Sequence, residues 1–510
     1  MRRLLCVAVL IGGASMFTDA ASNTVAVEGG QLRGTTVDGI RTFKGIPFAA
    51  PPVGALRWKG PQPVVAWSGV KAADTFGAQC MQQPYPAGSP YASAPQPTSE
   101  DCLYLNVWTA AREGEKRPVM VWIHGGGWTR GSGSTAVYDG AILAKKGVVV
   151  VTTNYRLGAF GFFAHPELTK ESPTHASGNY GILDHIAALK WVQNNIAAFG
   201  GDPTRVTIFG ESAGSWSVSV VQATPLAKGL FHRAIGESGG QFAGTTTLAQ
   251  AERRGVAFGT SVSARTLADL RALPADKLLG VESFRTAVNV DGYVLPEDVR
   301  SIFARGRQNS VPVLVGSNAD EMTTLSNAAT FPTSMEEFHL QMAVRFPGFS
   351  PQFDAAYPVK TEADIPAVLL ALGRDQTFTS EMRTWARMVT AAGQKAFLYQ
   401  FTHVPPSPNA KTWGAYHASE IAYVFGTLRN RDWKYSQTDF KLSDQMSSYW
   451  TNFASGGDPN GKKLPAWTPY DQTEEPYLEL GDTIKTKHHL LKAQLDFLDD
   501  AALRRRPVAQ

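Results

Sequence analysis

The sequence predicts an α/β fold in which a central, mostly parallel sheet is covered by helices on both faces. Two continuous apolar runs, 118–123 and 148–155, have the composition of strands that are buried on both faces. A helical pattern follows at 180–199, with apolar residues three or four positions apart, and a β-rich run, 205–209, comes after it. Strands that alternate with helices along the chain indicate parallel strands joined by crossover helices.

Shorter segments extend the predicted sheet on either side of these runs. From 24 to 43, short β-like pieces alternate with glycine turns, which is typical of a small antiparallel sheet at an edge. Further strands are expected at 103–108, 231–235, 311–315 and 396–401. Between the later strands, segments of about 246–309 and 334–392 have a helical pattern without strand alternation.

Composition places the chain among globular proteins with a large core. Of its 510 residues, 43% are hydrophobic and 18% are charged, and the net charge is only +4. Basic residues are scattered rather than gathered into a stripe, so nucleic-acid binding is not expected. No Cys/His cluster has metal-ligand spacing, and we expect neither a metal nor another cofactor. The sequence does not indicate an oligomeric state.

The N-terminus has the features of a secretory signal peptide. Arg2 and Arg3 form a positive segment, an apolar stretch runs from 4 to 17, and small residues follow. We expect cleavage near Ala20, which assigns 1–20 to the signal peptide. The apolar stretch is too short to span a bilayer permanently, so we expect a secreted or periplasmic protein with no stable membrane anchor.

Two cysteines remain after cleavage, Cys80 and Cys102. In an oxidising compartment such a pair predicts one disulfide, the alternative being two separate buried thiols. The loop that the disulfide would close, 82–99, is rich in Pro, Ser and Ala, so little else would order it. No internal repeat or long linker divides the mature chain, and we expect 21–510 to be a single domain.

One five-residue motif, Gly210-Glu211-Ser212-Ala213-Gly214, predicts a catalytic serine. It follows the β-rich run and precedes a helix start, and a serine between two glycines on such a turn is the nucleophile elbow of an α/β-hydrolase. Only small neighbours allow the chain to pass close to the strained serine backbone. In that fold, the segments 246–309 and 334–392 would be cap insertions that shape the pocket entrance.

Three successive glycines supply the expected oxyanion hole. They directly follow the 118–123 strand, where their backbone N–H groups are unobstructed by side chains. The amides of Gly126 and Gly127, together with that of Ala213, would form a hole with three donors. We interpret the adjacent His124 as a structural residue and not as the catalytic base.

The residue pattern leaves two candidates for each remaining catalytic group. In this fold the acid and the histidine follow the serine, in that order. Asp320 and Glu321 both lie on the loop after a predicted strand, and spacing does not choose between them. His403 ends a later strand and His417 lies on the loop beyond it, and either could serve as the base.

Longer motifs are spread over nearly the whole mature chain, from about Thr24 to beyond Asn460. They are Glu100–Val107, Phe160–Phe162, Gly178–Gly181 with Asp184, Phe199–Gly214, Trp450 with Asn452–Phe453, and Asp458–Asn460. Together they resemble the signature segments of the type-B carboxylesterases, the family that includes the cholinesterases. The resemblance implies an α/β-hydrolase that cleaves small-molecule carboxylic esters through an acyl-enzyme intermediate.

The resemblance also implies roles that spacing leaves open. It selects Glu321 as the acid and His417 as the base beside the nucleophile Ser212. Other positions match structural features of the family, namely its first disulfide (Cys80 and Cys102), a salt bridge (Arg57 and Glu100) and a serine that supports the acid (Ser238).

Three positions depart from the family pattern. Met322 and Ala418 stand where glycine is usual, and Trp128 replaces a phenylalanine. The tryptophan that binds choline in cholinesterases has no counterpart in the 82–99 loop, so choline-ester hydrolysis is not expected. Among other functions of this fold, a lipase, an amide or thioester hydrolase and a non-catalytic adhesion protein are alternatives. Substrate contacts are expected at Trp128, Trp216, Phe242, Thr324 and Leu325.

Overall fold

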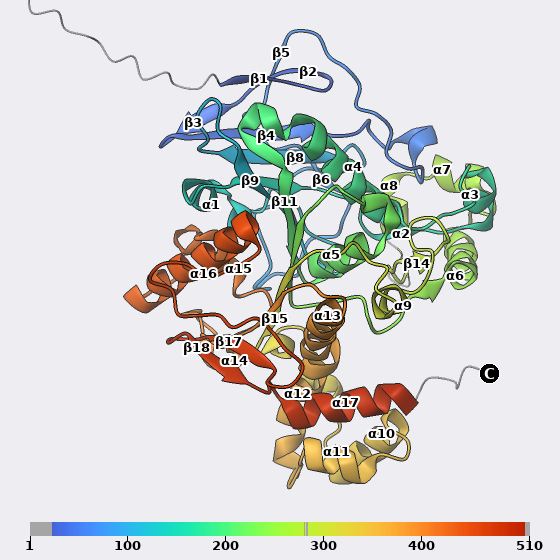
Figure 1. Ribbon diagram of the computed structural model, residues 1–510. Helices are drawn as coiled ribbons and strands as arrows, with labels where there is room; N and C mark the ends of the chain where they lie inside the picture. Colours follow the sequence, from blue (N-terminus) through green and yellow to red (C-terminus); the bar gives the residue numbers. More distant parts are fainter. Residues whose placement is uncertain (1–22, 280, 282–283, 505–510) are drawn as a thin grey trace, which may run out of the picture.

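A mixed sheet of 11 strands forms the centre of the computed structural model, which describes residues 23–279, 281 and 284–504 (Figure 1). The predicted signal peptide, 1–20, lies outside the described residues. In spatial order the strands are β18 (Lys485–His488), β17 (Pro476–Leu480), β16 (Ala396–Phe401), β15 (Val313–Asn318), β12 (Arg233–Glu237), β11 (Gly201–Glu211), β9 (Arg117–Ile123), β10 (Val149–Thr153), β8 (Tyr104–Thr109), β4 (Ile40–Pro47) and β3 (Thr35–Val37).

The strands from β17 to β10 run parallel, and antiparallel strands extend both edges. The predicted central, mostly parallel sheet is therefore confirmed. The segment 24–43 differs from the expected single edge sheet. Its first strands, β1 (Thr24–Val27) and β2 (Gly30–Arg33), form a separate three-stranded sheet with β5 (Val70–Ala72), whereas β3 and β4 join the large sheet. The chain changes sheets at Gly34, where a Cβ would lie 2.5 Å from a β4 carbonyl oxygen.

Side chains of the central strands alternate between two apolar cores, one on each face of the sheet. In β9, Val119, Val121 and Ile123 belong to one core, and Met120 and Trp122 to the other. This alternation follows from the two-residue period of a strand. Helices α4, α5, α9 and α13 cover the first face and α1, α15 and α16 the second, on opposite sides of the sheet in Figure 1.

The helices that cover the sheet differ in length. Their bounds are α1 (Ala141–Lys145), α4 (Tyr180–Asn195), α5 (Ala213–Ala223), α9 (Val299–Ala304), α13 (Ser380–Ala391), α15 (Ile421–Phe425) and α16 (Gln437–Gly456). The helix predicted over 180–199 ends earlier, because a 3₁₀ turn (Ile196–Phe199) follows α4 and Gly200 then adopts a left-handed conformation with φ 77°. Other short helices are α2 (Gly158–Phe162), α3 (Pro166–Glu171) and α14 (Ala410–Trp413).

The two segments expected to form the cap have different surroundings. The segment 246–309 contains α6 (Leu248–Ser261), α7 (Leu267–Ala272), α8 (Ala275–Leu279) and α9, together with two short paired strands, β13 (Thr246–Thr247) and β14 (Asn289–Val290). The segment 334–392 contains α10 (Met335–Arg345), α11 (Ser350–Ala356), α12 (Ile365–Arg374) and α13. Helices α10 to α12 share a separate apolar core with α17 (Lys492–Arg504), at the bottom of Figure 1, whereas α13 packs on β15 and β16.

A disulfide joins Cys80 and Cys102 and closes the loop between them. The paired strands β6 (Gln79–Cys80) and β7 (Thr98–Ser99) bring the two ends of this loop together. Next to it, Arg57 and Glu100 form an ion pair through two hydrogen bonds of 2.7 and 2.5 Å. The loop is therefore fixed at its base by covalent and ionic contacts.

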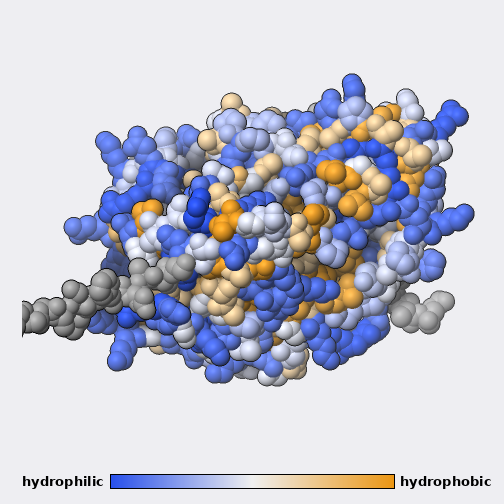
Figure 2. All heavy atoms as spheres, turned by 90° about the horizontal axis from the view of Figure 1, so that it is seen from above, coloured by the Kyte–Doolittle hydropathy of each residue, from blue (hydrophilic) through white to orange (hydrophobic). Residues whose placement is uncertain are grey.

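The surface is mostly hydrophilic on the face seen from above. In Figure 2, hydrophobic side chains on this face form small groups separated by hydrophilic ones. Within the described ranges, no helix is both long enough and apolar enough to cross a membrane.

Candidate active site

Ser212 lies on the sharp turn between β11 and α5, in a strained conformation with φ 56° and ψ −125°. The glycines on either side of it are required by the end of β9. A Cβ at Gly210 would lie 2.6 Å, and one at Gly214 only 2.0 Å, from the carbonyl oxygen of Ile123. Because real Cβ atoms do not approach backbone oxygen so closely, both positions need glycine if the turn is to keep this shape.

The glycine loop after β9 lies against this turn. A Cβ at Gly125 would be 3.0 Å from the Cβ of Ser212. Gly126 and Gly127 have φ values of 102° and 63°, which glycine adopts without strain. No residue in the described part of the chain accepts a hydrogen bond from the N–H groups of Gly126, Gly127 or Ala213. These three N–H groups therefore have no hydrogen-bond partner among the described residues.

Glu321 and His417 meet although they come from different loops. His417 Nδ1 lies 2.5 Å from Glu321 Oε2. The other carboxylate oxygen of Glu321 accepts hydrogen bonds from Ser238 Oγ at 2.6 Å and from the Asn318 backbone N–H at 2.7 Å. A carboxylate partner at Nδ1 keeps the proton on that nitrogen and leaves Nε2 free to accept another.

The Nε2 atom of His417 lies 3.0 Å from Glu211 Oε1. The described residues contain no hydrogen bond between Ser212 Oγ and His417, a bond that often forms only when substrate binds. Burial raises the pKa of the Glu211 carboxyl well above its usual value, and the nearby Glu321 and Glu237 raise it further. These surroundings favour the neutral form of the Glu211 carboxyl beside the imidazole.

The two residues that the family resemblance did not select, Asp320 and His403, have other hydrogen-bond partners. Asp320 accepts a hydrogen bond from the backbone N–H of Ala415 at 2.8 Å, so it supports the loop that carries His417. His403 lies between two carboxylates, with Nδ1 2.5 Å from Asp482 and Nε2 2.8 Å from Asp439. The structure thus brings Glu321 and His417 together, and not Asp320 and His403.

His124, interpreted from the sequence as structural, is fully buried below the glycine loop. Its ring stacks on Tyr155 with 4.4 Å between the ring centroids, and Nδ1 lies 2.9 Å from the carbonyl oxygen of Gly125. Burial lowers the pKa of this imidazole to about 4. The residue is therefore a neutral packing partner of the loop.

The three departures from the family pattern are accommodated differently. The Met322 side chain lies against α12, where a Cβ at Gly373 would be 3.1 Å from Met322 Cγ. Ala418 has φ 67°, a conformation that favours glycine and costs about 1 kcal/mol for alanine. Trp128 is buried and stacks on Phe162 with 5.1 Å between ring centroids. The side chains of Met322 and Trp128, which are larger than those usual in the family, thus pack against α12 and Phe162.

Of the residues expected to contact substrate, two tryptophans lie next to each other. The rings of Trp128 and Trp216 meet edge to face at 5.3 Å, and Trp216 is half-buried. Phe242 is only 1% exposed, and its ring packs against Phe303 and Trp385 at 5.1 and 5.7 Å. The structure therefore places Phe242 in the core behind the site.

Thr324 and Leu325 lie after the loop that carries Glu321. Leu325 is exposed, and Thr324 Oγ1 forms a 2.6 Å hydrogen bond with the hydroxyl of Tyr91. This bond links the Glu321 loop to the disulfide loop, so that the two loops border the site together.

Three aromatic residues at the site were not among the sequence candidates. Tyr85 and Tyr91 come from the disulfide loop, and their ring centroids are 5.8 Å apart. Tyr91 and Phe378 both contact the His417 ring, with centroids at 6.2 and 4.8 Å. Phe378 lies on a π-helical turn between α12 and α13, a feature without a sequence signal. Aromatic residues within a disulfide-tethered loop were the available signal for the tyrosines.

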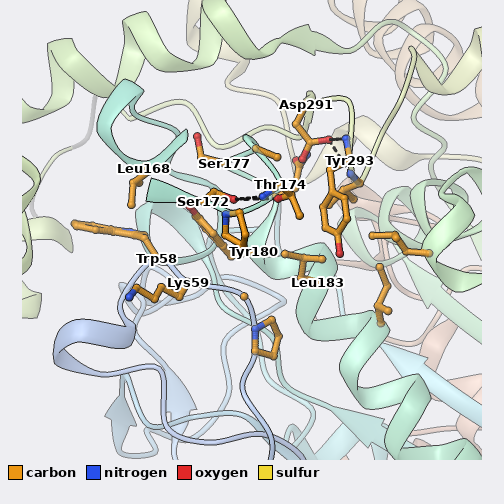
Figure 3. Close-up of a pocket in the computed structure, with 18 of the residues that line it drawn as sticks. Trp58, Lys59, Leu168, Ser172, Thr174, Ser177, Tyr180, Leu183, Asp291 and Tyr293 are labelled. Carbon is orange, nitrogen blue, oxygen red and sulfur yellow. Dashed lines mark hydrogen bonds between the residues drawn. The ribbon is translucent and has the colours of Figure 1, made fainter. Parts of the chain in front are cut away.

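A separate cavity of about 430 Å³ lies between the segment 58–62, α4 and the segment 291–294. Figure 3 shows Trp58, Tyr180 and Tyr293 among the side chains that line it. None of the predicted catalytic residues lines this cavity. Among the residues that the structure describes, no group of three or more His, Cys, Asp or Glu side chains is placed to hold a metal ion.

A mostly parallel sheet with a strained serine between a central strand and its helix defines an α/β-hydrolase. The fold and the comparisons with known proteins agree on this class. The chain belongs to the carboxylesterase family, whose sequence model matches residues 21–498. It is a carboxylic ester hydrolase.

Relatives of this chain come from bacteria and mammals. It is 38% identical over 470 residues to the fumonisin B1 esterase of Sphingopyxis macrogoltabida, and the matched region covers 88% of this chain and 84% of the relative. It is 36% identical to liver carboxylesterase 1F of Rattus norvegicus, over 93% of this chain and 92% of the relative. It is also 36% identical to the human cocaine esterase, over 91% and 88% of the two chains.

Proposed function

We propose that the protein is a serine carboxylesterase whose triad is Ser212, His417 and Glu321. The observation that supports this most is the buried contact between His417 Nδ1 and Glu321 Oε2, 2.5 Å long, because it fixes the tautomer that a base needs. The strained backbone of Ser212 adds support, since such a conformation is retained where a side chain must be presented to substrate.

The proposed reaction has two steps. Ser212 Oγ attacks the ester carbonyl carbon while His417 Nε2 takes the hydroxyl proton, and the protonated imidazole then gives that proton to the departing alcohol. Water, deprotonated by His417, next attacks the acyl carbon, and the bond to Ser212 Oγ breaks as His417 returns the proton to that oxygen, which releases the carboxylic acid and the free enzyme. Glu321 stabilises the imidazolium in both steps without itself becoming protonated.

The amides of Gly126, Gly127 and Ala213 are proposed to bind the oxyanion of each tetrahedral intermediate. They have no acceptor among the described residues, Ala213 follows Ser212 directly, and the glycine loop meets Ser212 at Gly125. Donors that are already in place need no reorganisation when charge develops, so removing one costs on the order of 100-fold in rate.

Replacement of the nucleophile tests this proposal. Ser212→Ala should lower kcat for a p-nitrophenyl ester by about 10⁵-fold or more, with the residual rate coming from the oxyanion hole and binding. Ser448→Ala, at a half-buried serine on α16, is the matched control and should retain wild-type turnover. Wild-type turnover in Ser212→Ala would refute the assignment.

We further propose that substrate choice is set where the disulfide loop, the glycine loop and the cap meet. The side chains that border this region are those of Trp128, Trp216, Thr324 and Leu325, and Phe242 supports it from the core. Helices α10 to α12 would form the cap of the single catalytic domain, 21–510. Relatives are named for esters as different as fumonisin B1 and cocaine, and one as a fatty acyl-CoA hydrolase. A panel of esters that varies acyl length and charge, ranked by kcat/KM, tests this proposal.

We also propose that the protein is exported. The disulfide between Cys80 and Cys102 is consistent with an oxidising compartment. Mass spectrometry of the mature protein should find an N-terminus close to Ala21, and an intact N-terminus on cytoplasmic protein would contradict export.

A further inference from the structure

We propose that Arg130 and Tyr85 form a carboxylate-binding subsite beside the oxyanion loop, so that preferred esters carry a free carboxylate near the scissile bond. The inference rests on the proposed function of Ser212 and adds a substrate class to it. Its basis is the position of two unpaired polar groups at the edge of the glycine loop.

Both residues lie against Gly126, Arg130 through its backbone and Tyr85 through its hydroxyl. The Arg130 backbone N–H donates to the Gly126 carbonyl oxygen at 3.0 Å, which closes the turn after the glycine triplet. The Arg130 guanidinium lies over the Tyr85 ring, 5.6 Å from its centroid. A Cβ at Gly126 would be only 2.9 Å from the Tyr85 hydroxyl oxygen. The Tyr85 hydroxyl therefore lies next to a proposed oxyanion donor, and the Arg130 guanidinium lies on the face of the same tyrosine ring.

Most of the donor capacity of this pair is unused. Arg130 donates through Nε to the carbonyl oxygen of Gln83 at 3.2 Å, and this is its one side-chain hydrogen bond to the described residues. No carboxylate of the described chain lies within ion-pair distance of Arg130, and the Tyr85 hydroxyl has no hydrogen-bond partner there. A guanidinium with two free Nη groups can bind a carboxylate through two parallel hydrogen bonds.

The neighbouring acids do not compete for this guanidinium. Glu211 is the acid that faces Tyr85, but it is buried, and burial raises the pKa of its carboxyl, which favours the neutral form. Glu321 is occupied by His417 and by two further donors. On the other side of the disulfide loop a second guanidinium, Arg431, donates to the carbonyl oxygen of Pro90. The charges at this border of the site therefore favour an anion.

The subsite is close to the reacting groups. The Tyr85 ring neighbours Tyr91 at 5.8 Å, and Tyr91 in turn neighbours the His417 ring at 6.2 Å. Two aromatic side chains, Tyr85 and Tyr91, thus lie between Arg130 and the base. Because the Tyr85 hydroxyl lies beside Gly126, the proposed substrate is an ester with a short chain between its reacting carbonyl and its free acid, such as a monoester of a dicarboxylic acid.

A pair of substrates of equal chain length measures the effect of the charge. Mono-p-nitrophenyl glutarate carries a carboxylate where p-nitrophenyl pentanoate carries a methyl group, and rates are corrected for spontaneous hydrolysis. The readout is the ratio of kcat/KM for the anionic ester to that for the neutral ester. Arg130→Gln should lower this ratio by about tenfold or more, as expected for the loss of a charge-assisted hydrogen-bond pair.

Other variants separate charge recognition from a structural role. Arg130→Lys should recover part of the ratio, because it keeps the charge but not the planar fork. Tyr85→Phe should lower the ratio by a few-fold, which is the effect expected for one neutral donor. Arg112→Gln, at an exposed arginine on the turn before β9 and thus at the other end of that strand from the glycine loop, should leave the ratio unchanged. In the wild-type enzyme, high salt should lower the ratio.

Each outcome decides the proposal. An unchanged ratio in Arg130→Gln overturns it. Where Arg130→Gln fails to fold, a wild-type ratio that does not respond to salt, together with wild-type behaviour of Tyr85→Phe, overturns it instead. Failure of the proposed function is distinguishable, because Ser212→Ala would then hydrolyse both esters as the wild-type protein does.

Discussion

Four non-glycine residues with positive φ gather around the active site. They are Trp128, Ser212, Ser238 and Ala418, with φ values of 58°, 56°, 54° and 67°. Each such conformation costs on the order of 1–3 kcal/mol and persists only where the surroundings hold it. Trp128 follows the oxyanion glycines, Ser238 donates to Glu321, and Ala418 follows His417. The backbone is therefore strained next to every group that the proposed mechanism uses.

The steric requirement at the elbow gives the first prediction. Gly214→Ala would place a Cβ 2.0 Å from the Ile123 carbonyl oxygen, so the turn must open. We expect at least about a 100-fold loss of kcat, since displaced catalytic groups lose their alignment, and a loss of several kcal/mol in the free energy of unfolding. Urea denaturation and p-nitrophenyl ester turnover measure both effects.

A matched control is available in α16. Gly456 has no atom within 4 Å of its added Cβ and does not need positive φ. Gly456→Ala should leave activity unchanged and stabilise the protein by up to about 1 kcal/mol. Equal behaviour of the two variants would contradict the steric account of the elbow.

The second prediction separates the two adjacent acids. Glu321→Gln should lower kcat by about 10³–10⁴-fold, because the amide no longer stabilises the imidazolium or fixes its tautomer. Asp320→Asn keeps an oxygen that can accept from the Ala415 N–H, so its kcat should fall by less than about tenfold. Ester turnover measured on both variants decides the matter, and the reverse order of effects would assign the acid to Asp320.

At the scale of elements, the disulfide loop, 82–99, lines one side of a site whose other residues follow the strands of the sheet. Its tyrosines contact Gly126 and the His417 ring, and Tyr91 bonds to Thr324. Gln82 exchanges two hydrogen bonds of 2.8 Å with the backbone of Gly131, the residue after Arg130. The loop is thus fixed both at its disulfide and along its length.

The third prediction follows from this construction. Replacing Cys80 and Cys102 by serine should lower the free energy of unfolding by about 3 kcal/mol, since the 22-residue separation leaves a loop whose unfolded state is no longer constrained. It should also lower kcat/KM, because Tyr85 and Tyr91 lose their positions. Thermal unfolding and ester kinetics measure these effects. Wild-type stability and activity in the double variant would show that the loop is ordered without its disulfide.

Much of the architecture and part of the site could be predicted from local patterns in the sequence. The apolar strands and the motif around Ser212 depend on neighbours within a few residues, so they could be predicted from the sequence. The contact between Glu321 and His417 joins residues 96 positions apart, and spacing alone left Asp320 and His403 as equals. Phe242 was expected to face substrate, but it packs against Trp385, since apolar character does not reveal the direction of a side chain.

At the scale of the whole molecule, buried carboxyl groups couple folding to pH. Burial raises the pKa of Glu237 and of Glu381 to about 8. The folded protein therefore holds protons that the unfolded chain releases at a lower pH. Their contribution to stability is complete below the unfolded pKa, near 4.5, and is lost as the pH rises towards about 8.

The fourth prediction concerns Glu381 on α13. Glu381→Gln keeps an oxygen that accepts the 2.6 Å hydrogen bond from the Phe242 N–H but removes the titration. Between about pH 5 and about pH 8, the free energy of unfolding should fall by on the order of 3 kcal/mol less in this variant than in the wild-type protein. Urea denaturation at the two pH values measures it, with the exposed Glu336→Gln as control. An unchanged pH dependence in Glu381→Gln would show that this carboxyl is ionised in the folded protein.

Covalent labelling tests the central claim, that Ser212 is the nucleophile, most directly. A fluorophosphonate reacts only with a serine that is activated by its base and stabilised by an oxyanion hole. We predict one adduct per chain, mapped by peptide mass spectrometry to Ser212, with loss of ester hydrolysis in proportion to labelling. Labelling at another residue, or full hydrolysis by a fully labelled protein, would contradict the account.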